Sequence, residues 1–264
     1  MSTPNPYAAP KAPVADETLA LPGRFVPGGQ ARPAGSGTAW IADGWRLFMK
    51  SPGIWIAIVV VMAVIMMALN FIPFVGAIAV AVLTPIFGGG LMLGCRALDE
   101  GNELEFGHLF AGFRNQAGAL ATVGAIYLGL AFAIGVVIVV ITGASMLTVM
   151  GGGAPADPAA TAGAAITSLI AALIGLALLV PVAMLMWFAP ALVVLNQLGA
   201  VDALKQSWSG CVKNIVPFLI YGVVLFVLAI IATLPLMLGW LVLGPVLAGS
   251  VYASYRDIYI ARGE

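Results

Sequence analysis

Long apolar blocks occupy most of the sequence between residues 54 and 255. A helix needs roughly 20 mainly apolar residues to cross the hydrocarbon core of a bilayer. The first four blocks each supply one such helix, and the last, at 215–255, is long enough for two, with Leu234-Pro235 as the expected turn. The sequence therefore predicts an all-α integral membrane protein with six transmembrane helices, at 54–72, 75–94, 117–141, 165–190, 215–234 and 236–255.

Composition supports lipid as the solvent of this chain. Hydrophobic residues make up 62% of it and charged residues only 8%, whereas soluble domains carry about 25% charged residues. The formal net charge is zero, so no excess of basic charge points to nucleic acid. We therefore expect membrane lipids as partners, with another membrane or peripheral protein as an open alternative, and no nucleic acid.

The basic residues indicate how the chain lies in the membrane. In the six-helix layout every Lys and Arg falls on one side, and the opposite connections, near Pro73, at 143–163 and near Pro235, carry only Asp157 as a charge. Because cytoplasmic loops are rich in Lys and Arg, both termini are expected in the cytoplasm. The residues on that side are Lys11, Arg24, Arg32, Arg46, Lys50, Arg96, Arg114, Lys205, Lys213, Arg256 and Arg262.

The first 38 residues differ from the rest, which we take as one membrane domain over 39–264. They are rich in proline and alanine, and they lack the basic start and apolar core of a secretory signal peptide. Such a segment buries too little apolar area to offset its ordering entropy, so a disordered cytoplasmic tail is predicted. Residues 24–27 are more apolar than their surroundings and are a candidate for local docking.

An internal repeat is visible when TPIFGGGLMLGCR, residues 84–96, is set beside GPVLAGSVYASYR, residues 244–256. The prolines, one glycine and the final arginines align, and Trp45 and Lys50 similarly match Trp208 and Lys213. The middle of the chain fits more loosely, with Pro181 in place of the other prolines and no arginine after it. We therefore predict three helical-hairpin repeats, each preceded by an amphipathic interfacial helix.

Small residues and prolines inside the predicted spans have two interpretations. Helices in lipid associate through close van der Waals contact, which small residues permit, and neighbouring helices can satisfy the carbonyls that a proline leaves free. Packing is therefore the favoured role, and a hinge for a gate or a bound lipid is the alternative. The positions concerned are Pro85, Gly88, Gly89, Gly90, Pro181, Pro245 and Gly249.

Segments with helical periodicity precede each predicted hairpin, at 39–50, 104–115 and 200–214. Apolar aromatic faces beside basic residues are typical of helices that lie in the headgroup layer. They either orient the spans or together form a platform for anionic lipid or a peripheral partner. The residues assigned to this interface are Trp40, Trp45, Lys50, Arg96, Phe110, Arg114, Trp208, Lys213 and Arg256.

Catalytic and metal-binding patterns are missing from the sequence. No ionisable residue lies deep within a predicted span, which argues against a pump or a proton-coupled transporter. His108 has no Cys or His at ligand spacing, and the two cysteines, Cys95 and Cys211, belong to no motif. The acidic residues at 99–105 are expected to form a solvated linker. We expect no enzyme activity, no cofactor and no metal.

Four stretches carry a resemblance to a known family: WIADGWRLFMKSPGIW, FGHLFAGF, FAPALVVLNQLGAVDALKQSW and PVLAGSVYASYRDIY. Over residues 24–260 the chain resembles uncharacterised bacterial inner-membrane proteins, which are distantly similar to the membrane domain fused to some glycerophosphodiesterases. The resemblance implies six helices in a bacterial inner membrane and no catalytic residues. The leading hypothesis is a non-enzymatic scaffold or lipid-associated component, and the alternative is a transporter or permease for a small uncharged or lipidic substrate.

Overall fold

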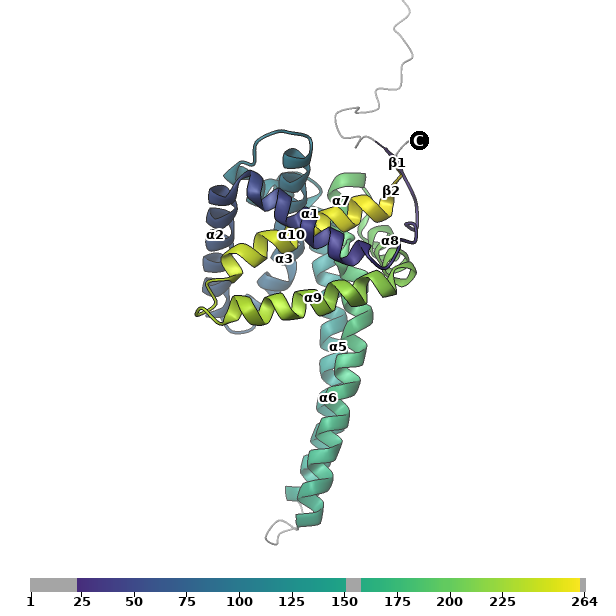
Figure 1. Ribbon diagram of the computed structural model, residues 1–264. Helices are drawn as coiled ribbons and strands as arrows, with labels where there is room; N and C mark the ends of the chain where they lie inside the picture. Colours follow the sequence, from purple (N-terminus) through teal and green to yellow (C-terminus); the bar gives the residue numbers. More distant parts are fainter. Residues whose placement is uncertain (1–22, 151–157, 262–264) are drawn as a thin grey trace, which may run out of the picture.

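The computed structural model describes residues 23–150 and 158–261, and helices dominate it (Figure 1). Lys11, Asp157 and Arg262, which entered the predicted topology, lie outside these residues. In chain order the elements are β1 (Arg24–Phe25), α1 (Ser36–Lys50), α2 (Pro52–Asn70), α3 (Val75–Asp99), the 3-10 helix η2 (Phe106–Phe110), α4 (Ala111–Arg114), α5 (Ala117–Met150), α6 (Pro158–Trp187), α7 (Ala189–Asn196), α8 (Ala200–Lys213), α9 (Ile215–Thr233), α10 (Trp240–Tyr259) and β2 (Ile260–Ala261).

Among the described residues, five helical stretches are long and apolar enough to cross a membrane. They are Pro52–Asn70, Val75–Asp99, Ala117–Gly143, Thr161–Asn196 and Ile215–Thr233. These stretches overlap the first five predicted spans, and Thr161–Asn196 continues through α6 into α7 with a bend at Phe188. The multi-pass, all-α class predicted from the sequence is therefore confirmed at this coarser level.

The predicted sixth span, at 236–255, is not among those five. Its counterpart α10 begins at Trp240, after a turn that contains two residues with left-handed backbone, Leu236 and Met237. Its second half carries hydroxyl groups and charges, and much of it is buried inside the molecule, including Ser250 and Ser254. Polar residues lower the mean hydropathy of a helix, but they are not exposed to lipid where they pack against protein.

Burial divides the apolar helices into one central helix and several peripheral ones. In the apolar stretch of α3, 56% of the residues are buried, against 6% for α5. Figure 1 shows α5 and α6 as a long hairpin that extends away from the other helices, with the end of α5 and the start of α6 far from β2. In the same view α9 runs across the direction of that hairpin, so the apolar helices do not form one parallel bundle.

Residues 24–35 fall within the tail predicted to be disordered through residue 38, yet they make defined contacts with the rest of the chain. Arg24–Phe25 pairs with Ile260–Ala261 as a short antiparallel ladder, so the two described ends of the chain lie together. Arg32 donates a 2.8 Å hydrogen bond from Nε to the Asp257 carbonyl, and Lys213 Nζ donates one of 2.8 Å to the Gly29 carbonyl. These bonds to α8 and α10 supply the ordering that composition alone does not predict.

The predicted helix over 104–115 is instead two short pieces, η2 and α4. Glu105 and His108 form a capping box at the start of η2, and Gly107 and Gly112 fall inside the two pieces. Because glycine is a poor helix former, this stretch gains little from a continuous α-helix. Its aromatic residues pack on α3, where the ring centroids of Phe87 and Phe113 are 5.6 Å apart.

Three of the short helices pack on a long helix through one kind of contact. In each, a small residue faces the carbonyl oxygen of one residue of the long helix and the backbone nitrogen of the residue four positions later. A Cβ atom at Gly44 of α1, for example, would overlap the carbonyl oxygen of Val246 and lie 2.7 Å from the nitrogen of Ser250. These contacts are Gly44 with Val246 and Ser250, Gly112 with Ile86 and Gly90, and Ser207 with Met184 and Phe188; Gly37 of α1 makes a further one with Pro217 and Tyr221 of α9.

Candidate functional site

An apolar groove lies where α1, α9 and α10 meet, and its volume is about 680 Å³. We call it the α1–α9–α10 groove. Helices α9 and α10 and the turn between them contribute only apolar residues and glycine to its walls. The residues from α1 are Thr38, Ile41, Ala42, Trp45 and Arg46, and those from the remaining walls are Val224, Leu228, Ile231, Ala232, Pro235, Gly239, Val242, Leu243 and Val246.

Arg46 is the one charged residue among those that line this groove. The Arg46 side chain is 76% exposed, and its Nη1 donates a 2.7 Å hydrogen bond to Asp43 Oδ1. A guanidinium has five N–H donors, so this bond leaves capacity for a phosphate oxygen. Trp45 beside it is 48% exposed. The groove thus combines long apolar walls with a cation and an amphipathic ring, an arrangement that suits an amphiphile with an anionic head.

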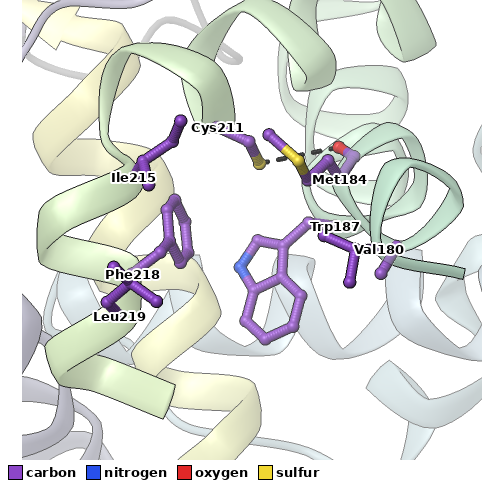
Figure 2. Close-up of a pocket in the computed structure, with 8 residues that line it drawn as sticks. Val180, Met184, Trp187, Cys211, Ile215, Phe218 and Leu219 are labelled. Carbon is purple, nitrogen blue, oxygen red and sulfur yellow. Dashed lines mark hydrogen bonds between the residues drawn. The ribbon is translucent and has the colours of Figure 1, made fainter. Parts of the chain in front are cut away.

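A second groove, of about 240 Å³, lies between α6, α8 and the start of α9, and we call it the α6–α8–α9 groove (Figure 2). Cys211 faces it, and its thiol donates a 3.5 Å hydrogen bond to the Met184 carbonyl. Burial raises the pKa of the Cys211 thiol to about 12, so the thiol stays protonated at neutral pH and is no nucleophile. Trp187 and Phe218 face each other across the same groove.

A third groove, of about 540 Å³, lies between α3, α5 and the junction of α6 with α7. Its polar side chains are Asn70, Thr84 and Tyr127. Thr84 Oγ1 and Asn70 Nδ2 donate 2.7 Å hydrogen bonds to carbonyls of their own helices, so both donors are occupied within the helix. Pro85 and Gly88, two predicted packing or hinge positions, line this groove as well.

The predicted packing positions lie at helix contacts. A Cβ at Gly89 would lie 2.9 Å from a Val194 methyl group, and one at Gly90 would overlap the backbone of His108. Gly249 abuts Gly44, and a Cβ at Gly88 would lie in van der Waals contact with Pro190, 3.6 Å away. Pro85 and Pro245 are buried within their helices, and Pro181 is partly buried in α6.

Several residues expected at the lipid headgroups instead hold protein to protein. Trp40 is 1% exposed, its Nε1 donates a 3.0 Å hydrogen bond to Asp257 Oδ2, and its ring packs on Phe218. Lys50 Nζ donates to the Leu98 carbonyl at 2.5 Å. The reason is geometric: Trp40 shares the buried face of α1 with Gly44 and Leu47, and α1 packs against α10.

The arginines that end α3 and α10 follow the same pattern. Arg96 Nε donates a 2.7 Å hydrogen bond to Glu100, and Arg256 forms an ion pair with Asp99. Tyr252 also donates a 3.2 Å hydrogen bond to Asp99. Asp99 is therefore a structural anchor, not part of a solvated linker as predicted. No local signal marks it, because its partner lies 157 residues away in the chain.

Other predicted interfacial residues are exposed. Three aromatic residues each follow the small residue of a short-helix contact, and their exposed fractions are similar: 48% for Trp45, 43% for Phe113 and 40% for Trp208. Phe110 and Arg114 are exposed beside Phe113. Within the described residues, no group of three or more His, Cys, Asp or Glu side chains could hold a metal ion. The exposed aromatic and basic side chains and the three grooves are therefore the surfaces available for binding.

Comparison with known proteins places this chain among membrane proteins without a known activity. Residues 113–257 match a family described as a domain of unknown function (DUF7847). A protein of Burkholderia thailandensis that is named a probable inner membrane protein is 28% identical over 247 residues, which cover 86% of this chain and 92% of that protein. No solved structure matches the chain. These findings support the uncharacterised membrane family, and they do not extend to glycerophosphodiesterases.

Proposed function

This chain belongs to the DUF7847 family of domains of unknown function, and we propose that it is a non-enzymatic, lipid-associated component of a bacterial inner membrane. The observation that carries the proposal is the α1–α9–α10 groove, whose walls are apolar and whose charged group is Arg46. An acyl chain fits those walls, and a phosphate fits the guanidinium. The occupant is an anionic phospholipid, which the surrounding membrane supplies.

The energetics of such a site are modest and reversible. Moving a CH₂ out of water contributes about 0.8 kcal/mol, but an acyl chain that enters the groove from the bilayer only exchanges one apolar environment for another. That exchange contributes little, so selectivity comes from the headgroup, where one Arg contributes on the order of 1 kcal/mol. We therefore expect preference for anionic over zwitterionic lipid, not tight capture.

The topology we propose has both termini in the cytoplasm and six membrane-embedded helices in three hairpins. Pairing of β1 with β2 and the distance from β2 to the end of α5 and the start of α6 support a single side for both ends (Figure 1). The three related short-helix contacts support the repeat. In this arrangement α10 is the sixth helix, shielded from lipid by α1 and α9, and the α9–α10 hairpin crosses the membrane obliquely.

A scaffold role follows from the three exposed aromatic residues. Trp45, Phe113 and Trp208 each sit on a short helix at the side where the basic residues gather. Tryptophan is enriched at membrane–water interfaces because an amphipathic ring is stable there. These residues are proposed to fix the depth of the protein and to leave the cytoplasmic surface for a peripheral partner.

Lipid retention tests the proposal directly. The protein is reconstituted with equal amounts of phosphatidylglycerol and phosphatidylcholine, extracted gently and weighed with its bound lipids by native mass spectrometry. We expect retained phosphatidylglycerol, and about a five-fold loss of it in Arg46→Gln, which corresponds to about 1 kcal/mol. Arg114→Gln, an exposed arginine outside the groove, is the matched control. Equal retention of phosphatidylglycerol by wild type and Arg46→Gln would show that the α1–α9–α10 groove is not the lipid site.

The third groove favours a second candidate, a transporter for a small uncharged or lipidic substrate. It places Asn70, Thr84 and Tyr127 beside Pro85, so polar groups lie next to an irregular position in α3. Liposomes that contain the protein and a fluorescent phosphatidylglycerol test this role by quenching of the outer leaflet. Complete quenching, which requires movement from the inner leaflet, supports transport, whereas quenching that stops near half supports the lipid-associated scaffold.

A further inference from the structure

The α6–α8–α9 groove contains a buried hydrogen-bond donor that has no acceptor among the described residues. We propose that this groove binds an ester carbonyl of a membrane phospholipid, with Trp187 Nε1–H as the donor. The inference rests on the proposed lipid association, and it adds a second site and names the group that is recognised there.

Trp187 carries the first part of the argument. Its Nε1 atom is buried and has no hydrogen-bond partner among the described residues. The indole N–H is a donor only, so a water or an acceptor must meet it or its hydrogen bond is lost. Most buried polar side chains have a partner, and an exception inside a groove therefore points to a bound group.

The neighbours of Trp187 hold the ring in place without supplying that acceptor. Its ring meets Phe218 edge-on at 5.7 Å and Tyr221 at 5.8 Å, with interplanar angles of 80° and 88°. The face of an aromatic ring accepts an N–H only weakly. The Tyr221 hydroxyl is engaged by Ser250 at 2.6 Å. Figure 2 shows the indole nitrogen on the side of the ring that faces Phe218, within the groove.

The other lining residues select the chemistry of the occupant. Val180, Ala183, Ile215 and Leu219 are apolar, and the Cys211 thiol already donates to Met184. A water in such a place needs two to four polar partners and finds one. An ester carbonyl needs one donor for its oxygen and an apolar surface for the chain that follows it. The groove offers both.

The positions of the lining residues in the chain indicate how deep the α6–α8–α9 groove lies in the membrane. Trp187 is the last residue of α6, and Cys211 and Ile215 flank the junction of α8 with α9, at the membrane boundary predicted from the basic residues. Ester carbonyls of phospholipids lie at this boundary, where tryptophan is enriched. The occupant is accordingly a diacyl phospholipid of the cytoplasmic leaflet, with an acyl chain against the apolar walls of the groove.

Lipids that differ only in the linkage test the proposal. The protein, labelled with ¹⁵N at its indoles, is placed in nanodiscs of diester phosphatidylglycerol or of diether phosphatidylglycerol with the same chain lengths. Trp187→Phe, which keeps an aromatic ring, assigns the Trp187 indole signal. We expect that signal downfield in the diester lipid and shifted upfield in the diether lipid, with several-fold slower proton exchange in the diester. An upfield position in both lipids would mean that the N–H rests on the Phe218 ring and would overturn the proposal.

Native mass spectrometry separates this site from the α1–α9–α10 groove. Trp187→Phe is expected to retain severalfold less diester lipid than wild type and the same amount of diether lipid. A loss of lipid in Arg46→Gln with no effect of Trp187→Phe or of the linkage would refute the ester site and leave the proposed function standing. Retention of no lipid by the wild-type protein would refute both.

Discussion

Gly44 on α1 lies directly against the backbone of Val246 on α10, and this contact joins the first helix of the described chain to its last. Gly112 on α4 meets Ile86 on α3 in the same way, and Ser207 on α8 bonds to Met184 on α6. Two of these short helices therefore pack on the long helix that precedes them in the chain. Within the described residues no long helix precedes α1, which packs on α10 instead, so this contact closes the described helices into a ring.

Gly44→Ala tests the closure of this ring. The added Cβ would overlap the Val246 carbonyl oxygen, so α1 has to move away from α10. We expect a loss of about 1–3 kcal/mol in the free energy of unfolding, the range for overpacking of a close contact. Gly222→Ala on α9 is the control, because a Cβ there meets nothing within 4 Å. Thermal unfolding in detergent measures both variants, and equal melting temperatures would contradict the closure.

The ion pair between Asp99 and Arg256 is expected to tie α3 to α10. Asp99→Asn removes the charge but keeps the shape, and because the pair is only partly buried we expect a loss of about 1–2 kcal/mol. Glu103→Gln, an exposed residue nearby, serves as the control. In a double-mutant cycle with Arg256→Gln, a coupling energy near zero would show that the two charges do not interact.

Cys211 should resist alkylation across the neutral and mildly alkaline range. Burial raises the pKa of its thiol from 9.0 to about 12, so the thiolate stays scarce at pH 9, where a free thiol is half ionised. The fold favours the neutral thiol, and this contribution to stability is present below pH 9 and lost as the pH rises toward 12. The rate at which maleimide labels Cys211 in the Cys95→Ala variant, measured at pH 7 to 9, tests this expectation. Labelling of the folded protein as fast as that of the unfolded chain would contradict the burial.

Cysteine accessibility tests the proposed topology. Ala162→Cys lies at the far end of the α5–α6 hairpin and should react with an impermeant maleimide added outside intact cells. Ala162 and its two neighbours in the chain are exposed. Glu103→Cys, between α3 and η2, should react only after the membrane is opened. Reaction of Glu103→Cys from outside would invert the orientation. The native cysteines, Cys95 and Cys211, are buried and contribute little background.

The sequence by itself determined the membrane class and the positions of the first five long helices. Length and hydropathy are properties of a continuous stretch, so they are legible without any knowledge of what packs against it. Small residues are legible in the same way, and Gly90 and Gly249 lie at close contacts of α3 and α10.

Only the tertiary structure decided which residues face lipid and which face protein. Trp40 and Lys50 have the composition of interfacial residues, yet they bond to Asp257 and Leu98. Asp99 is predicted to lie in a solvated linker, yet it forms an ion pair with Arg256 and joins α3 to α10. Trp187 resembles any boundary tryptophan until its donor is found buried and unpaired among the described residues. Each of these assignments depends on a partner from another part of the chain, and such partners are fixed by helix packing, which local composition does not encode.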